Sequence, residues 1–172
     1  MQSGSYQPRD RRGQAREGHI MTMEQYELAF RLINLGVLPG WLLLMVAPGW
    51  KGTKWLVHSS ILILVFAGLY VLWLGWALVG GQNNPDGSMG SLQGVMALFA
   101  HPMGVLVGWT HYLAFDLFVG AWIVRDAARR GVMHWAVIPC LILTLMFGPV
   151  GLLTYIIVRA ASGKGGLGLE EG

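Results

Sequence analysis

The chain has 172 residues, of which 54% are hydrophobic and only 12% are charged, whereas about a quarter of the residues of a soluble domain are charged. This composition excludes an ordinary soluble domain, and it excludes disorder over most of the length. The net charge of +3 comes from basic residues at the ends of apolar runs, so no nucleic-acid partner is expected. The single cysteine, Cys140, excludes an intramolecular disulfide, a CxxC redox pair and a thiolate zinc cluster.

The first residues are unlike the rest of the chain. Residues 1–23 are polar and rich in Gly, Gln and Arg, and we predict that they form a disordered leader. Met21 and Met23 stand at its end, and either is an alternative start of translation.

Four apolar runs of about 20 residues follow, the length that a helix needs to cross ~30 Å of hydrocarbon. They cover residues 28–47, 55–79, 104–124 and 135–158. Pro149 falls inside the last run and is expected to kink it. The predicted fold class is therefore all-α: a polytopic membrane protein with a bundle of four transmembrane helices in residues 24–159, followed by a disordered tail in 160–172.

The gap between the second and third runs has a pattern of its own. After a turn-rich stretch, apolar residues recur at helical spacing at Leu92, Val95, Met96 and Phe99. About 12 residues are too few to cross a membrane, so a short interfacial helix is predicted here. A re-entrant segment is the alternative.

The basic residues indicate an orientation. With four spans, both termini and the second gap share one side of the membrane. The two short gaps lie on the other side, and their basic residues stand next to the ends of the spans: Lys51, Lys54, Arg125, Arg129 and Arg130. Because cytoplasmic loops carry an excess of Lys and Arg, the short gaps are predicted to be cytoplasmic.

Between Leu32 and Val158, Asp116 is the one charged residue that falls inside a predicted span. An ionised carboxylate that faces lipid costs several kcal/mol, so Asp116 must face the bundle, find a partner or stay protonated. Tyr112 and Trp109 share its helix face, whereas His111 is about 140° away and joins it only if the buried face is wide. This pattern predicts a proton-exchanging site. A carboxylate that only fixes helix packing is the plainer alternative.

Depth in the bilayer selects further candidates. Counted from the same membrane surface at ~1.5 Å per residue, Thr144 lies level with Asp116, while Asn34 and Tyr70 lie a little deeper. Asn34, Tyr70 and Thr144 are predicted, together with Trp109, to contact a ligand.

The five histidines raise the question of haem. His58 and His111 differ in depth by roughly 15 Å, too much for two axial ligands of one iron. The other histidines fall in the leader or the gaps. We therefore expect no metal and no other cofactor.

Three segments carry a family resemblance: LPGWLLLMVAPGW (38–50), HYLAFDLFVGAWIVRDA (111–127) and PCLILTLMFGPVGLLTY (139–155). With them the chain resembles the abscisic-acid-deficient-four family, best known for the plant neoxanthin synthase and including small bacterial relatives. The resemblance implies an integral membrane protein of four helices. A bacterial relative in an inner membrane is expected, and no established catalytic residues carry over.

For plant members the resemblance implies a part in converting violaxanthin, an epoxide, into the allene neoxanthin. This is a redox-neutral isomerisation, in which an acid protonates the epoxide oxygen and a base removes a vinylic proton, without a cofactor. Asp116 is the expected acid or base, with Tyr112 and His111 as its catalytic companions.

The sequence leaves open whether the chain is an enzyme. It could be a carotenoid epoxide isomerase, or act elsewhere in isoprenoid metabolism. The alternative is a non-catalytic lipid or pigment binder, or an assembly subunit of a membrane enzyme. The expected partners are membrane lipid, a carotenoid or other isoprenoid, and a second copy of the chain or a partner membrane enzyme.

Overall fold

The computed structural model describes residues 21–166 and 168, and this part of the chain is helical, without a strand. Its helices are α2 (Met23–Val46), α3 (Lys51–Thr53), the π-helical segment η1 (Lys54–His58), α4 (Ile61–Val79), α5 (Leu92–Phe99), α6 (Pro102–Arg130), α7 (His134–Phe147) and α8 (Pro149–Ala161). The all-α prediction is confirmed. The predicted leader lies outside the described residues, except for its last few positions.

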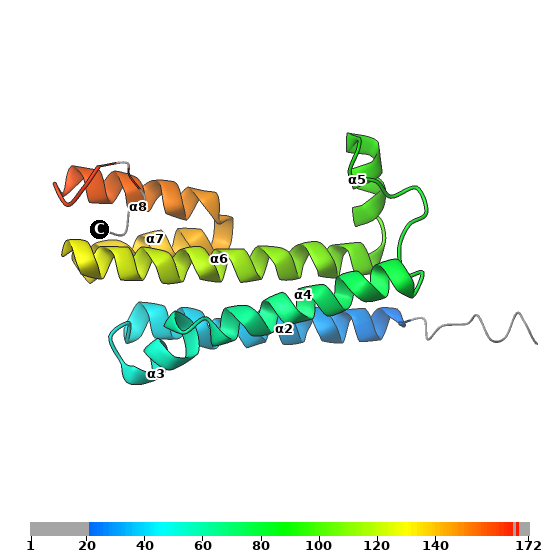
Figure 1. Cartoon of the computed structure of the whole chain (residues 1–172), viewed down its shortest axis with the longest axis horizontal. Coiled ribbons are helices and arrows are strands. Elements are labelled where there is room, and N and C mark those ends of the chain that lie inside the picture. The colour runs from blue at the N-terminus through cyan, green and yellow to red at the C-terminus, as the bar shows by residue number, and fades with distance from the viewer. Residues whose placement is uncertain (1–20, 167, 169–172) are drawn as a thin grey trace, which may run out of the picture.

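Three long helical stretches lie side by side and form the body of the molecule (Figure 1). They are α2, the stretch Lys51–Val79 that ends with α4, and α6, and each is long and apolar enough to cross a membrane. α6 is the central one, because it contacts α2, α4, α7 and α8. The three stretches coincide with the first three predicted spans.

Local sequence signals set the ends of the long helices. Thr22 and Gln25 form a capping box at the start of α2. At the start of α6, the His101 side chain accepts a hydrogen bond from the Met103 amide, and Pro102 occupies the first helical position, where no N–H is needed. α6 ends at Gly131, whose φ of 68° is the left-handed conformation that glycine adopts readily.

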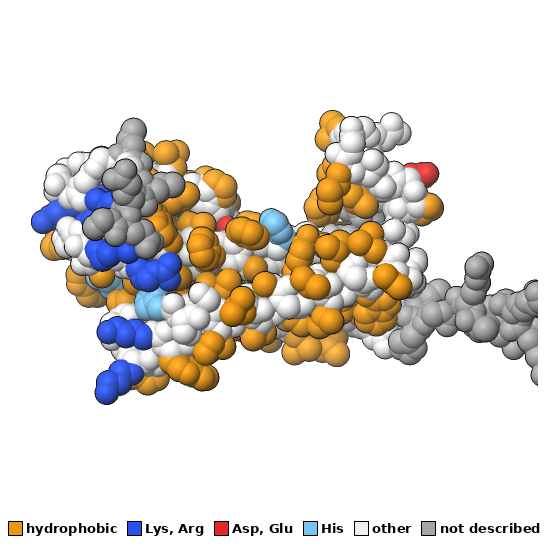
Figure 2. Space-filling view, in the orientation of Figure 1, with side chains coloured by type: hydrophobic (Ala, Val, Ile, Leu, Met, Phe, Trp, Pro, Cys, Tyr) orange, Lys and Arg blue, Asp and Glu red, His pale blue; other side chains and the backbone are white. Residues whose placement is uncertain are grey.

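The core between α2 and α6 is built around Trp41, whose side chain is fully buried. A Cβ atom at Gly120 of α6 would lie 2.7 Å from the Trp41 ring, so only glycine allows this approach. Leu44 and Leu117 fill the space around it and are also fully buried. The outer faces of α2, α4 and α6 carry exposed apolar side chains, a surface suited to lipid (Figure 2).

The fourth apolar run is not one helix, and this corrects the sequence prediction for residues 135–158. It forms α7 and α8, of 14 and 13 residues, which pack against each other as a hairpin. The turn is at Gly148, with φ 47° and ψ −96°, and Pro149 begins α8 instead of kinking a longer helix. At ~1.5 Å per residue each arm is about 20 Å long, shorter than the ~30 Å of hydrocarbon. Four spanning helices are therefore not confirmed.

The hairpin changes the side on which α8 ends. α7 begins at the end of α6 that carries Arg129 and Arg130, and α8 returns to that same end (Figure 1). Basic side chains consequently gather at this end (Figure 2). The chain brings seven basic residues to it, from the connection between α2 and α4, the last turns of α6 and the end of α8: Lys51, Lys54, Arg125, Arg129, Arg130, Arg159 and Lys164. The segment that follows α8 therefore belongs to this basic end rather than to the side of α2's first turn. That the basic end faces the cytoplasm stays a prediction from the excess of positive charge.

This arrangement makes a testable prediction about topology. In a Cys140→Ser background, a cysteine at Ser162 should react with an impermeant thiol reagent from the same side of the membrane as a cysteine at Lys51. A cysteine at Gly87, in the loop before α5, should react only from the other side. Labelling of Ser162 and Gly87 from one common side would restore the fourth span.

α5 forms between the second and third long stretches, as the apolar spacing predicts. Ser91 caps it by accepting a hydrogen bond from the Gly94 amide. α5 and the residues after it press on the start of α6, where a side chain at Gly104 would collide with the Leu98 carbonyl and one at Gly108 with the Phe99 ring. These two glycines therefore allow α5, not another long helix, to pack closely against α6. Its position at the membrane interface stays a prediction.

Candidate functional site

Asp116 lies against the turn of the α7–α8 hairpin. Its side chain is only 8% exposed. A Cβ atom at Gly148 would lie 2.6 Å from Asp116 Oδ1, so the carboxylate fills the space that the glycine leaves. Its other oxygen, Oδ2, is buried without a hydrogen-bond partner in the described part of the chain. The turn of the hairpin therefore packs against Asp116, the acid in the middle of α6.

The sequence around Gly148 explains why the turn forms there. The Gly148 amide closes α7 by donating to the Thr144 carbonyl at 2.8 Å. Pro149 cannot donate within a helix, and it disfavours a helical conformation in the residue before it. Glycine accepts the resulting positive φ. Because α8 starts at this turn, the positive end of its dipole faces the Asp116 carboxylate and offsets part of the free energy of burying a charge.

Two predicted residues join Asp116 at the turn. The Tyr112 hydroxyl donates to the Leu145 carbonyl of α7 at 3.3 Å, and Tyr112 lies one helical turn before Asp116 on the same face of α6. Thr144 is fully buried, and its hydroxyl donates to the Cys140 carbonyl at 2.8 Å. Tyr112 therefore connects the acid to the hairpin, whereas the Thr144 hydroxyl is occupied inside its own helix.

A row of aromatic rings continues from Tyr112 to α2. The Trp109 ring centroid lies 5.3 Å from that of Tyr112 and 5.5 Å from that of Phe30. The Trp109 indole N–H donates to Asn34 Oδ1 at 3.1 Å. The structure thus places predicted residues Asn34, Trp109 and Tyr112 in one connected row that ends at Asp116.

His111 and Tyr70 form a separate group. Their ring centroids are 5.5 Å apart, and the His111 ring stacks on Phe115 at 4.6 Å. His111 is exposed on the outer face of α6, and no contact joins it to Asp116 within the described residues. The structure therefore does not bring His111 to the acid whose partner it was predicted to be.

A small apolar cavity of about 190 Å³ opens between α6 and α8, lined by Phe118, Val119, Trp122 and Leu152. Val119 is one helical turn beyond Asp116, and Leu152 is one turn beyond Gly148. A ligand in this cavity would extend toward the acid. Among the described residues no three His, Cys, Asp or Glu side chains are grouped so that they could hold a metal ion.

A second buried acid was missed by the sequence analysis. Asp126 is fully buried near the C-terminal end of α6, and its Oδ2 accepts hydrogen bonds from the Tyr155 hydroxyl at 2.6 Å and from Arg159 Nη1 at 2.8 Å. Its Oδ1 accepts from Arg130 at 2.8 Å and Arg129 at 3.3 Å. The spacing of Asp126 and Arg130 on one helix face was visible in the sequence. The contact of Asp126 with Arg159 on α8 was not visible in the sequence.

Arg159 also binds the segment that follows α8. Its side chain is fully buried, and Nη2 donates to the Gly166 and Gly168 carbonyls. This cluster ties α8 and the segment after it to α6. The cluster therefore stabilises the hairpin in the position that brings Gly148 next to Asp116.

The comparisons with known proteins place these features in a family. The family model described as "ABA DEFICIENT 4-like" matches residues 28–155, from α2 into α8. The chain belongs to the ABA DEFICIENT 4-like family. The resemblance stated from the sequence is confirmed, and the matched range includes Asp116 and every other predicted site residue.

A curated relative is similar over most of the chain. Protein ABA DEFICIENT 4, chloroplastic, of Arabidopsis thaliana is 25% identical over 150 residues, which cover 84% of this chain. The match spans 66% of the relative, just under two thirds of its length. No solved structure matches.

Proposed function

We propose that this member of the ABA DEFICIENT 4-like family acts on a carotenoid or related isoprenoid inside the membrane, and that Asp116 exchanges the proton in a redox-neutral isomerisation. The observation that carries the proposal is the carboxylate itself. It is buried beside a hairpin turn that stops part-way along α6, and one of its oxygens has no hydrogen-bond partner among the described residues. A buried polar group without a partner is costly and calls for an explanation, of which a catalytic role is one.

The surroundings of Asp116 suit a long apolar substrate. The cavity between α6 and α8 is smaller than an ordinary ligand pocket of roughly 300–1,000 Å³, so it would hold one end of an isoprenoid while the rest lies along the lipid-facing surface. The aromatic row from Tyr112 to Phe30 offers flat apolar faces on the other side.

The chemistry needs two proton transfers that balance. An acid gives a proton to the epoxide oxygen as its C–O bond breaks. A base takes a proton from a polyene carbon, and the electrons of that C–H bond form the new double bond. Asp116 would perform one of these transfers, and its contact with Tyr112 gives it a neighbouring hydroxyl for the other. Product and substrate then have the same mass.

The proposal is tested with the full chain in liposomes that contain violaxanthin as the probe. We expect time-dependent formation of an isomer of unchanged mass with allene infrared absorption, absent from liposomes without the protein. Violaxanthin that co-purifies with the protein but is never converted would favour the alternative, a pigment binder. Neither binding nor conversion would favour an assembly subunit.

The proposed location is a membrane, in keeping with the helices long and apolar enough to span one. The relative's name gives a chloroplast location for that plant protein. The bacterial inner membrane stays a prediction, as do a second copy of the chain and a partner enzyme.

A further inference from the structure

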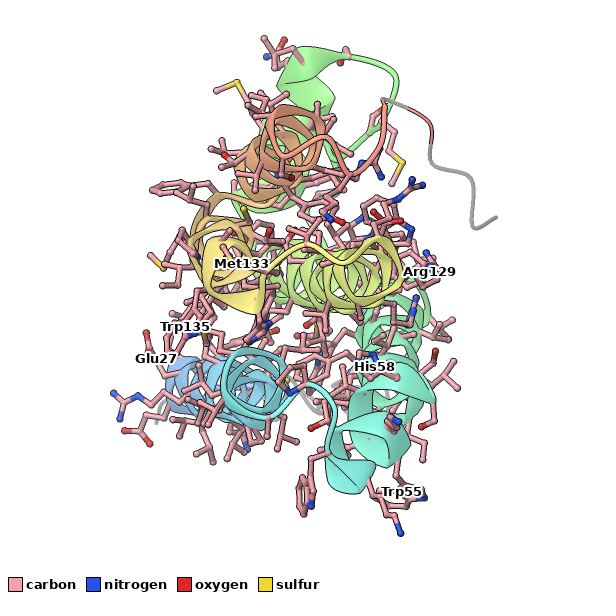
Figure 3. The ribbon with its side chains drawn as sticks, turned by 90° about the vertical axis from the view of Figure 1, so that its left-hand side faces the viewer. Glu27, Trp55, His58, Arg129, Met133 and Trp135 are labelled. Carbon is pink, nitrogen blue, oxygen red and sulfur yellow. The ribbon has the colours of Figure 1, made fainter. Side chains whose placement is uncertain are left out.

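The basic end of the molecule contains a second cavity, away from Asp116. It has a volume of about 470 Å³ and lies between the α2–α3 loop, η1, the end of α6 and the start of α7. Its apolar floor includes Pro48, Val124, Ala127 and Val132. Figure 3 looks onto this end, with His58 beside the start of α4 and Arg129 at the end of α6.

The polar groups that line this cavity are all basic: Lys54, His58, Arg125, Arg129 and His134. Lys54 and Arg125 are both close enough to His58 to interact with it electrostatically. Arg129 is already bonded to Asp126, and His134 Nε2 to the Met45 carbonyl at 2.8 Å. In the described part of the chain, no carboxylate pairs with Lys54 or Arg125.

Two cations that face one cavity without an acid repel each other, and this repulsion costs free energy unless an anion fills the site. The nearest carboxylate, Asp126, is one residue further along α6, and it is paired with three arginines other than Arg125. The positive charge at the cavity is therefore left uncompensated by the described chain, and it is available to a ligand.

The depth of the cavity indicates the kind of anion. Three exposed tryptophans surround this end, Trp50, Trp55 and Trp135, and tryptophan is enriched at the level of lipid headgroups. A pocket with basic groups above an apolar floor, at the end of membrane-spanning helices, is suited to a phosphate joined to an apolar body.

We infer that this cavity binds the phosphate of an anionic phospholipid from the adjoining leaflet, with Lys54 and Arg125 as the groups that hold it. The lipid occupies the space between the α2–α3 loop and the end of α6, and so links the first two long helices to the hairpin. The inference is independent of the reaction at Asp116.

The test measures lipid binding to the full chain in mild detergent by native mass spectrometry and by thermal unfolding. The probes are phosphatidylglycerol, phosphatidylcholine and inorganic phosphate. We expect tight binding and a raised melting temperature with phosphatidylglycerol only. Equal effects of phosphatidylcholine would overturn the inference. Equal effects of inorganic phosphate would show a free-phosphate site and overturn the lipid as its source.

A matched pair of double variants separates the cavity from general surface charge. Lys54→Gln with Arg125→Gln removes two charges from the cavity. Lys51→Gln with Lys164→Gln removes two charges from the same end outside it. Because a basic side chain that contacts an anionic headgroup contributes about fivefold to the affinity, removing both contacts should weaken phosphatidylglycerol binding about 25-fold. The control pair should change the affinity by less than about fivefold.

Equal losses in the two pairs would overturn the inference, because the lipid would then be held by the general field. If the first pair fails to fold, Lys54→Arg with Arg125→Lys keeps both charges, and it should retain binding within about threefold. The single Lys54→Gln variant should show about a fivefold loss, since Lys54 is exposed at the rim. Full binding by that variant would contradict the assignment of Lys54.

Discussion

Asp126→Asn should destabilise the folded chain by about 3–5 kcal/mol, because it leaves the fully buried Arg159 guanidinium without its carboxylate. The amide keeps the shape of the side chain, and it can still accept a hydrogen bond from Tyr155 or Arg159. It cannot compensate a buried positive charge. The measurement is the free energy of unfolding in mixed detergent micelles, titrated with a denaturing detergent.

Two further variants test the cause of this loss. Arg129→Gln removes an arginine that is about one third exposed and can be hydrated, so it should cost less than about 1 kcal/mol. Adding Arg159→Met to Asp126→Asn removes the buried charge and should recover much of the stability. A double variant as unstable as the single one would mean that Asp126 acts through packing or through Arg130, not through Arg159.

The long helices were predictable because composition, length and caps agree in them. α2, the Lys51–Val79 stretch and α6 are all long and apolar, and α2 and α6 also have clear end signals. The hairpin was not predicted, because a kinked span and two antiparallel arms have the same composition and total length. The signal lay in Phe147–Gly148–Pro149, where glycine before proline favours a break over a kink. Distinguishing the two requires knowing what the second arm packs against.

The turn at Gly148 also explains which site residues could be found by counting residues from the membrane surface. Thr144 lies before the turn, so counting residues from the basic end places it on the arm that leads to Gly148, the residue packed against Asp116. Tyr155 and Arg159 lie after the turn, where a straight span carries them to the opposite surface. The hairpin returns them to Asp126 instead. Side-chain direction was a second limit, because residues five apart, such as His111 and Asp116, face different sides of a helix.

Asp116→Asn should remove the isomerase activity while leaving the fold intact. An amide of the same shape can pack beside Gly148 but cannot exchange a proton, and losing a general acid or base typically costs 10²–10⁴-fold in rate. Stability should be unchanged or slightly higher, because the substitution removes a buried carboxylate whose Oδ2 has no partner among the described residues. The measurements are the rate of violaxanthin isomerisation in liposomes and the free energy of unfolding of the same protein.

The controls separate catalysis from packing at this position. Asp86→Asn makes the same chemical change in the exposed loop before α5, and should leave both rate and stability unaltered. Tyr112→Phe removes the hydroxyl that joins the acid to the Leu145 carbonyl, so its rate should fall while the aromatic row persists. If Asp116→Asn were instead fully active and clearly less stable, the role of the carboxylate would be to hold the hairpin against α6. The acid would then have to be sought elsewhere, because a group that gives up a proton in the reaction cannot be replaced silently by an amide.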